Sequence, residues 1–140
     1  MNNINNNLYV SNAQAVRNLP DDHQFDEVVT LGYYDQFSYS RPNASTTDDR
    51  FVFPDGEHDY NLFVGAVEYI LDALDNDKSV LVHCQAGCSR SPSVCMAVLT
   101  EYEDLSIDEA FCAVANAREQ TNPTDPLIAS LERYVGESLE

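Results

Sequence analysis

The sequence predicts an α/β fold with a central, mostly parallel sheet flanked by helices in three layers. Short apolar or β-branched runs, the candidate strands, precede segments with helical periodicity. The most apolar of these runs, residues 79–82, is typical of a strand buried on both faces in a parallel sheet. At 140 residues the chain has the size of one compact domain, so we expect a single domain over residues 1–140.

The first third of the chain predicts the order strand, helix, strand. Residues 8–10 (Leu-Tyr-Val) form a short strand candidate, and Ser11 or Asn12 can cap a helix over residues 13–19. A β-branched run within residues 27–31 then predicts a second strand.

A polar stretch and a turn follow. Residues 35–49 contain Pro42 and several Ser and Thr residues, which predicts an irregular loop. Residues 50–53 alternate in polarity like a short strand and stop at Pro54-Asp55-Gly56, a strong turn pattern. We therefore expect a strand that ends in a second loop.

The second half of the chain predicts helices around the buried strand. Apolar residues recur at helical spacing over residues 60–74, and the buried strand follows. A Gly-containing loop leads to a helix that has Pro92 in its first turn and ends near Tyr102. Ser106-Ile107-Asp108-Glu109 has the capping-box pattern of another helix, and the last helix begins near Asp125.

The charge balance limits the classes of partner. Asp and Glu total 24 against 7 Lys and Arg, which gives a formal net charge of -17. Nucleic acids and anionic membranes are bound mainly through Lys and Arg, so we expect neither as a partner. The acidic residues are scattered along the chain, which we interpret as adaptation to high intracellular salt, as in a halophile. An ordinary acidic surface is the alternative, and the sequence leaves the oligomeric state open.

Residues 1–7 lack the pattern of a secretory signal and no apolar run approaches the roughly 20 residues of a membrane span, so we expect a soluble, cytoplasmic protein.

The cysteines are expected to be free thiols. No CxxC pair is present, so we expect no metal site. Cys95 and Cys112 lie among apolar neighbours and are predicted to be buried in the core.

The loop after the buried strand carries the candidate chemistry. It contains a cysteine and an arginine five residues apart, in the segment His83-Cys84-Gln85-Ala86-Gly87-Cys88-Ser89-Arg90-Ser91. A loop that enters a helix N-terminus turns N–H groups inward and can hold a tetrahedral dianion. Arg90 can clamp two phosphate oxygens, and Gly87 allows the tight turn.

The same positive field makes Cys84 a candidate nucleophile, because it favours the thiolate over the thiol. Ser89 and Ser91 can donate hydrogen bonds into the loop, and Ser91 is placed to stabilise Cys84 as a leaving thiolate. His83 is expected to order the loop rather than to act as a base, since no base is needed once the thiolate is formed.

These residues resemble a known motif. His83-Cys84-x-x-Gly87-x-x-Arg90-Ser91 resembles that of the protein tyrosine phosphatase superfamily, and the rest of the chain resembles its small dual-specificity branch. Residues 8–13 resemble the opening segment of that branch, Pro54-Asp55-Gly56 its general-acid loop, and residues 118–131 its closing helix. The resemblance implies that Cys84 takes the phosphoryl group, that Asp55 protonates the leaving oxygen, and that water then hydrolyses the phosphocysteine without any metal or organic cofactor.

The departures from the family pattern bear on the substrate. Phe53 stands where the tyrosine-specific enzymes have Trp, which implies a shallow pocket that admits phosphoserine and phosphothreonine as well as phosphotyrosine of a phosphorylated protein substrate. The loop positions Gln85, Ala86, Cys88 and Ser89 carry no charge, which argues against polyphosphorylated lipids as substrates. A phosphate-binding pseudophosphatase and an RNA 5'-triphosphatase remain alternatives. Glu57 and Asp59 are alternative proton donors, and Cys88 could capture an oxidised Cys84 as a disulfide.

Overall fold

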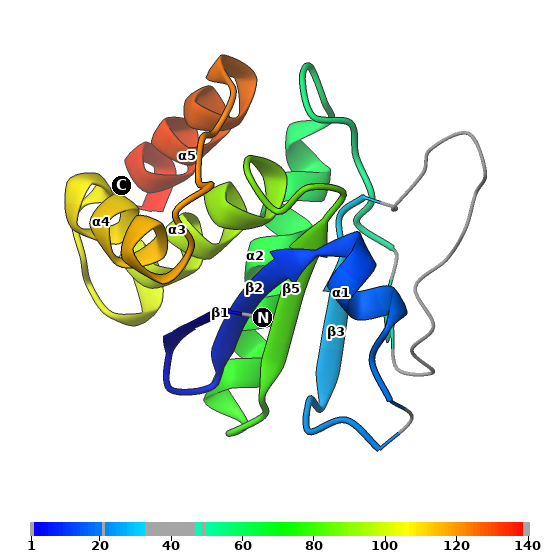
Figure 1. The fold of residues 1–140 in the computed structure, drawn as a ribbon. Helices are drawn as coiled ribbons and strands as arrows, with labels where there is room; N and C mark the ends of the chain where they lie inside the picture. Colours follow the sequence, from blue (N-terminus) through cyan, green and yellow to red (C-terminus); the bar gives the residue numbers. More distant parts are fainter. Residues whose placement is uncertain (1, 21, 33–46, 49, 139–140) are drawn as a thin grey trace.

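The computed structural model describes residues 2–20, 22–32, 47–48 and 50–138 (Figure 1). Five strands in these ranges form one sheet of order β1-β2-β5-β3-β4. Their bounds are β1 (Asn2–Asn5), β2 (Leu8–Asn12), β3 (Glu27–Thr30), β4 (Thr47–Asp48) and β5 (Val80–Cys84). Strand β1 is antiparallel to β2 and all other pairs are parallel, which confirms the predicted mostly parallel sheet.

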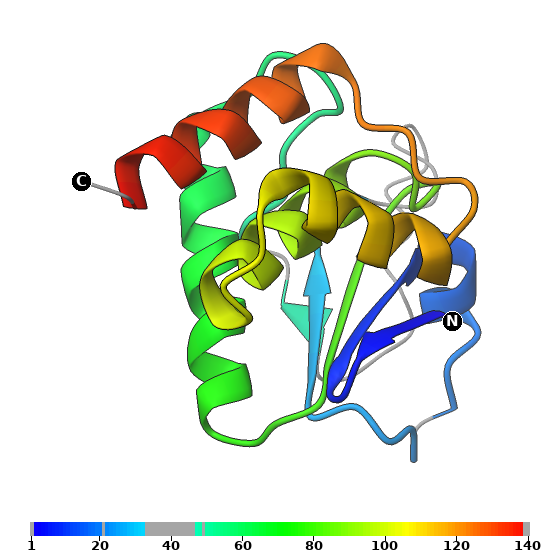
Figure 2. The same ribbon diagram turned by 90° about the vertical axis from the view of Figure 1, so that its left-hand side faces the viewer.

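Helices cover both faces of the sheet. They are α1 (Ala13–Arg17), α2 (Tyr60–Asp75), α3 (Arg90–Tyr102), α4 (Ile107–Ala117) and α5 (Asp125–Ser138). Figure 2 shows α2 on one side of the sheet and α1 on the other, while α4 and α5 pack on α3. Within the described ranges, no helix combines the length and apolar character needed to span a bilayer.

Alternating side chains of the central strand belong to two hydrophobic cores, one on each face of the sheet. Val80 and Val82 of β5 lie in the large core with α2 and α3, whereas Leu81 packs on the other face with Val16 and Phe25. Strand β5 is therefore buried on both faces, as its continuous apolar run predicted.

Two predicted helix caps are formed. Asn12 caps α1, because its side chain accepts a hydrogen bond from Ala15 N at 2.8 Å. At the start of α4, Ser106 Oγ accepts from Glu109 N at 3.1 Å and Glu109 Oε1 accepts from Ser106 N at 3.0 Å. Hydrogen bonding of the Glu109 carboxylate to Ser106, first of all from the Ser106 backbone N–H, lowers the pKa of Glu109, since it stabilises the charged form.

The prediction of a strand over residues 50–53 is wrong. The segment makes one backbone hydrogen bond to the sheet, from Phe53 N to Leu31 O at 3.2 Å, and it is held instead by its side chains: Phe53 is 2% exposed. The neighbouring strand is β4, inside the range predicted as a loop. The rest of that loop prediction, residues 35–46 and 49, lies outside the described residues.

Strand β1 was not expected, because Asn has a low strand propensity. Asn6 adopts a φ of 45°, a left-handed conformation that Asn tolerates, and this turn folds β1 back onto β2. Pairing with an existing strand edge therefore outweighs the local preference of the residues.

The two helical cysteines differ in burial. Cys95 is 0% exposed in the core, as predicted, and burial raises the pKa of its thiol. Cys112 is exposed, so its predicted burial is wrong. The inward face of α4 is formed by Ala110 and Val114, and a residue two positions from each lies on the opposite side of a helix.

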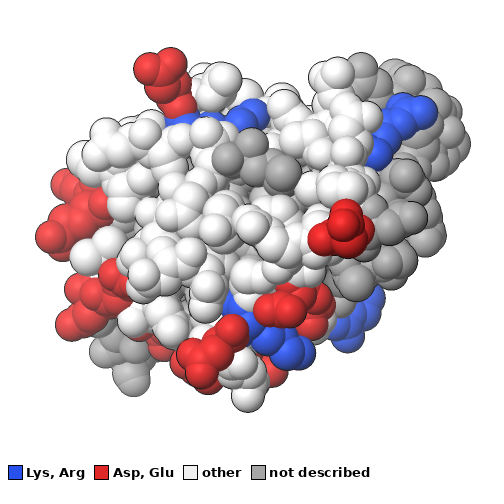
Figure 3. Space-filling model, turned by 60° about the horizontal axis from the view of Figure 1, so that its bottom comes forward, with Lys and Arg blue, Asp and Glu red and all other residues white. Residues whose placement is uncertain are grey.

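On the face drawn in Figure 3, acidic side chains are spread rather than gathered in one patch. Figure 3 shows them at several separate places on the face at the lower end of Figure 1, with few basic side chains among them. Lys78 forms an ion pair with Glu27 at 3.4 Å.

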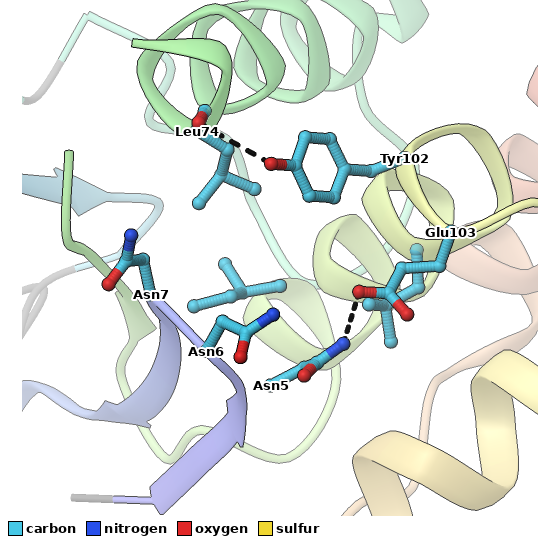
Figure 4. A pocket seen from close by; sticks show the side chains of 8 residues that line it. Asn5, Asn6, Asn7, Leu74, Tyr102 and Glu103 are labelled. Carbon is cyan, nitrogen blue, oxygen red and sulfur yellow. Dashed lines mark hydrogen bonds between the residues drawn. The ribbon is translucent and has the colours of Figure 1, made fainter. Parts of the chain in front are cut away.

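A small pocket lies at the amino ends of β2 and β5, where the Asn-rich turn meets α2 and α3 (Figure 4). Asn5 donates a hydrogen bond to Glu103, and the Tyr102 hydroxyl donates to Leu74 O at 3.5 Å. The loop from Cys84 to Arg90 leaves the opposite, carboxyl edge of the sheet, so this pocket is remote from the candidate site.

Candidate active site

The central strand of the sheet places Cys84 at the carboxyl edge. Cys84 is the last residue of β5 and is 2% exposed, and α3 begins at Arg90. Hydrogen bonds to the neighbouring strand ends hold the loop, from Ala13 N to Gln85 O at 3.0 Å and from Leu31 N to His83 O at 2.8 Å. Ligands of such sheets bind at this edge.

The thiol of Cys84 has hydrogen-bond donors beside it. Its Sγ lies 3.2 Å from Ser91 Oγ and accepts from Ser91 N at 3.5 Å. Both groups stabilise a thiolate more than a thiol, because a charged acceptor makes the stronger hydrogen bond. Ser91 therefore lies where a leaving thiolate would need a donor.

Arg118 shapes the loop of residues 83–91, which is called the phosphate loop below. Its Nε donates to Gly87 O at 2.7 Å and its Nη2 to Ala86 O at 2.8 Å. With these carbonyls turned toward Arg118, the N–H groups of the loop remain for an anion. Gly87 itself has a φ of 72°, and a Cβ there would lie 2.7 Å from Ser11 O, so only glycine fits.

The sequence reasoning assigned no role to Arg118, which it placed only in a segment resembling the family's closing helix. Arg118 is 7% exposed, and its Nη1 also donates to Asn2 Oδ1 at 2.8 Å. The sequence marks Arg118 only as one of few basic residues. This feature does not predict which backbone carbonyls the arginine binds.

Cys88 is half-buried in the same loop. Its thiol donates to Ala86 O at 3.7 Å, and its carbonyl accepts from Asn122 N at 2.6 Å. The segment before α5 therefore holds the loop at a second place. A disulfide between Cys88 and Cys84 stays a prediction.

Arg90 is oriented by backbone carbonyls. Its Nη1 donates to Phe53 O at 2.7 Å and to Leu31 O at 3.3 Å, while its buried Nε makes no hydrogen bond with any described residue. A buried polar group in this state is satisfied when an anion binds. Gly32 makes room for the guanidinium, because a Cβ there would lie 2.5 Å from Nη1.

Asp55 is exposed and linked to the phosphate loop by Thr124. The Thr124 hydroxyl donates to Asp55 Oδ1 at 3.1 Å, and Thr124 N donates to Ser89 Oγ at 2.9 Å. Thr124 is thus a shared support of both loops, and the sequence reasoning missed it along with Gly32. Both contacts join segments far apart in the chain, so no local pattern reveals them.

The two alternative acids lie differently. Asp59 caps α2, with its Oδ1 accepting from Asn61 N at 2.9 Å. Glu57 lines a hollow between this loop and α5 that also includes Arg133. Of the three carboxylates, Asp55 is the one joined to the phosphate loop through Thr124.

His83 is fully buried and neutral. Its Nδ1 lies 3.3 Å from Cys84 O and its Nε2 lies 2.8 Å from Thr30 Oγ1. A carbonyl only accepts, so Nδ1 carries the proton and Nε2 accepts from the Thr30 hydroxyl. Burial lowers the pKa of His83 to about 4. Its position joins the end of β5 to β3, as expected for a residue that orders the loop.

The burial of His83 predicts a pH dependence of stability. The folded pKa of about 4 is below the ordinary value of 6.5, so protonation favours the unfolded state. The contribution of His83 is complete above about pH 6.5, and roughly 3 kcal/mol of it is lost as the pH falls to 4. We expect urea unfolding of His83→Gln to lack this part of the pH dependence. His23→Gln is the control, and equal slopes for both variants would contradict the assignment.

Comparison with known proteins identifies the family. Residues 8–136 match the family model for the dual specificity phosphatase catalytic domain. Protein 123R of Invertebrate iridescent virus 6, named as a candidate tyrosine phosphatase, is 30% identical over 129 residues, which are 91% of this chain and 87% of that protein. Human dual specificity protein phosphatase 5 is 35% identical over 77 residues, which are 55% of this chain but 20% of that longer protein.

Solved structures show the same fold. Human DUSP28 superposes with a TM-score of 0.83 at 21% identity, covering 99% of this chain and 98% of that one. A mouse dual specificity phosphatase candidate, complexed with zinc tungstate, has a TM-score of 0.80 at 25% identity and covers 97% of this chain and 86% of that one. With a catalytic-domain match over residues 8–136, this chain belongs to the dual specificity phosphatase family.

Proposed function

We propose that this chain removes phosphate from tyrosine, serine and threonine residues of protein substrates through a phosphocysteine formed at Cys84. The proposal rests on one arrangement in the loop of residues 83–91. The nearly buried thiol of Cys84 lies beside Ser91 Oγ, and the buried Nε of Arg90 has no hydrogen-bond partner among the described residues. A nucleophile and an anion clamp in one loop suit phosphoryl transfer.

The two steps use side chains of this chain. The Cys84 thiolate attacks phosphorus, the P–O ester bond breaks, and the Asp55 carboxyl group gives its proton to the leaving oxygen. Water then attacks the phosphocysteine while the Asp55 carboxylate takes a proton from it. The P–S bond breaks, Ser91 donates to the departing thiolate, and inorganic phosphate is released.

Three further points support the proposal. The similar mouse protein is complexed with zinc tungstate, and tungstate is a tetrahedral oxyanion like phosphate. The nucleophile, the clamp and the proton donor are all present, unlike in a module that only binds phosphate. An RNA 5'-triphosphatase needs a basic channel for its strand, which a net charge of -17 disfavours.

The test is hydrolysis of matched phosphotyrosine, phosphoserine and phosphothreonine peptides, with acid quenching to trap the intermediate. We expect phosphate release from all three, and a phosphate adduct on Cys84 by peptide mass spectrometry. No release from any peptide would refute the proposal. Release from the phosphotyrosine peptide alone would refute the dual specificity.

We also propose that the acidic surface is adapted to a cytoplasm of high salt. The net charge of -17 makes the acidic side chains, which are spread over the face in Figure 3, repel one another, and dissolved salt screens this repulsion. We expect the melting temperature and the activity to rise from dilute buffer to molar KCl. Equal melting temperatures in both would mean that the acidity has no such role.

A further inference from the structure

The general-acid loop is anchored to α5 at two places. Thr124, just before the helix, donates to the Asp55 carboxylate at 3.1 Å. Within the helix, Ser130 Oγ lies 2.7 Å from Nε2 of His58, whose Nδ1 lies 2.6 Å from Gly56 O. Adjacent residues of the loop, Asp55 and Gly56, are therefore both tied to one helix.

The hydrogen-bond directions through His58 follow from its partners. The carbonyl of Gly56 accepts, so Nδ1 of His58 carries the proton and donates to it. In the neutral ring Nε2 is then an acceptor, and the Ser130 hydroxyl donates to it. The chain of donors runs from Ser130 through His58 to Gly56, and the side chain of Ser130 is held in the protein interior, since this residue is 7% exposed.

Aromatic packing fixes the ring of His58. It stacks on Phe53 with centroids 4.8 Å apart and planes 25° apart, and the Phe63 ring lies 6.3 Å away. The carbonyl of Phe53 accepts from Arg90 Nη1 at 2.7 Å, so the ring rests on the residue that orients the phosphate clamp.

Side-chain packing in the part of the chain that the structure describes does not restrict the loop at Gly56. A Cβ placed on Gly56 would meet nothing within 4 Å. Glycine also has the widest range of backbone conformations. Asp55 is exposed, and the hydrogen bond from Thr124 reaches its side chain, so this contact does not by itself restrict the backbone of the loop. The second anchor, at Gly56, does restrict it.

We propose that His58 is a positioning residue for the proton donor: by joining Gly56 to Ser130 of α5 it holds Asp55 over the phosphate loop. The inference rests on the proposed function. Its consequence is selective at the first step, because a displaced acid slows phosphocysteine formation only from substrates whose leaving group needs a proton, whereas the later hydrolysis is common to all substrates. The alkoxide of serine needs one, whereas a nitrophenolate leaves with little help.

The experiment compares p-nitrophenyl phosphate with a phosphoserine peptide. We expect His58→Ala to lower kcat/KM about 10-fold for the peptide, part of the 10²–10⁴-fold that a general acid contributes, and less than about 2-fold for the aryl ester. The ratio kcat/KM is compared because it reports phosphoryl transfer to Cys84 and not the later hydrolysis. In an Asp55→Asn background the same substitution should cause no further loss. His58→Asn should recover part of the peptide activity, because its amide can donate to Gly56 O.

Controls separate this role from a structural one. His23→Ala, at the other edge of the sheet, should leave both substrates unaffected, and Ser130→Ala should repeat the selective loss if His58→Ala does not fold. An equal loss on both substrates, or a loss that adds to that of Asp55→Asn, would overturn the role of His58. If the unaltered chain does not hydrolyse the aryl ester, the proposed function itself fails, and the role of His58 with it.

Discussion

Replacement of Cys84 by serine is expected to lower the turnover of p-nitrophenyl phosphate on the order of 10⁴-fold or more, since removal of a nucleophile eliminates the covalent route. A serine hydroxyl is scarcely ionised at neutral pH, so the hydrogen bonds of Ser91 have no thiolate to stabilise. Binding of vanadate should persist, because the backbone N–H groups and Arg90 are unchanged. Steady-state kinetics and vanadate titration measure the two effects.

The matched control for this substitution is Cys112→Ser, which changes an exposed thiol on α4. We expect it to keep the activity of the unaltered chain. A Cys84→Ser variant that retains about a tenth of that activity would contradict the covalent mechanism, because no single-step hydrolysis in the same loop should reach such a rate. Loss of vanadate binding would instead show that the thiol supports the loop.

Replacement of Asp55 by asparagine is expected to lower kcat/KM for a phosphoserine peptide by about 100-fold, within the range of general acid catalysis, and to affect kcat/KM for p-nitrophenyl phosphate much less. Asparagine can still accept the hydrogen bond from Thr124, so the loop should keep its position. The pH–rate profile for the peptide should also lose the limb that reports the protonated acid.

The alternative donors supply the controls. Asp59→Asn preserves the cap of α2, because asparagine caps helices as well as aspartate does, and Glu57→Gln changes an exposed side chain. We expect neither to discriminate between the two substrates. If Asp55→Asn leaves both reactions intact while one of these variants causes the selective loss, the acid is on that other carboxylate.

Local patterns predicted the five helices of the described residues and the strands β2, β3 and β5. The periodicity of residues 60–74 corresponds to α2 (Tyr60–Asp75), and the capping box at Ser106 is formed with both of its hydrogen bonds. Such features depend on residues a few positions apart, which interact within a single helix or turn. The buried run of β5 was recognisable because both faces of that strand are apolar.

Edges and helix faces were harder to predict. Strand β1 exists because it pairs with β2, although its asparagines disfavour a strand. Residues 50–53 alternate like a strand but lie beyond β4, held by the burial of Phe53. Cys112 is exposed because α4 packs through the face that carries Ala110 and Val114. In each case the deciding contact is with a partner that a local pattern does not contain.

The sequence by itself determined the chemistry of the phosphate loop, because Cys84, Arg90 and Ser91 lie within eight positions of one another on a strand, a loop and a helix start. The tertiary structure alone decided what supports them. Arg118 binds the carbonyls of Ala86 and Gly87, Thr124 links Asp55 to Ser89, and His58 reaches Ser130, in each case across tens of residues of chain. Hydrogen bonds of this kind form only where packing of α5 and the sheet brings distant backbone and side chains together, so no local pattern records them.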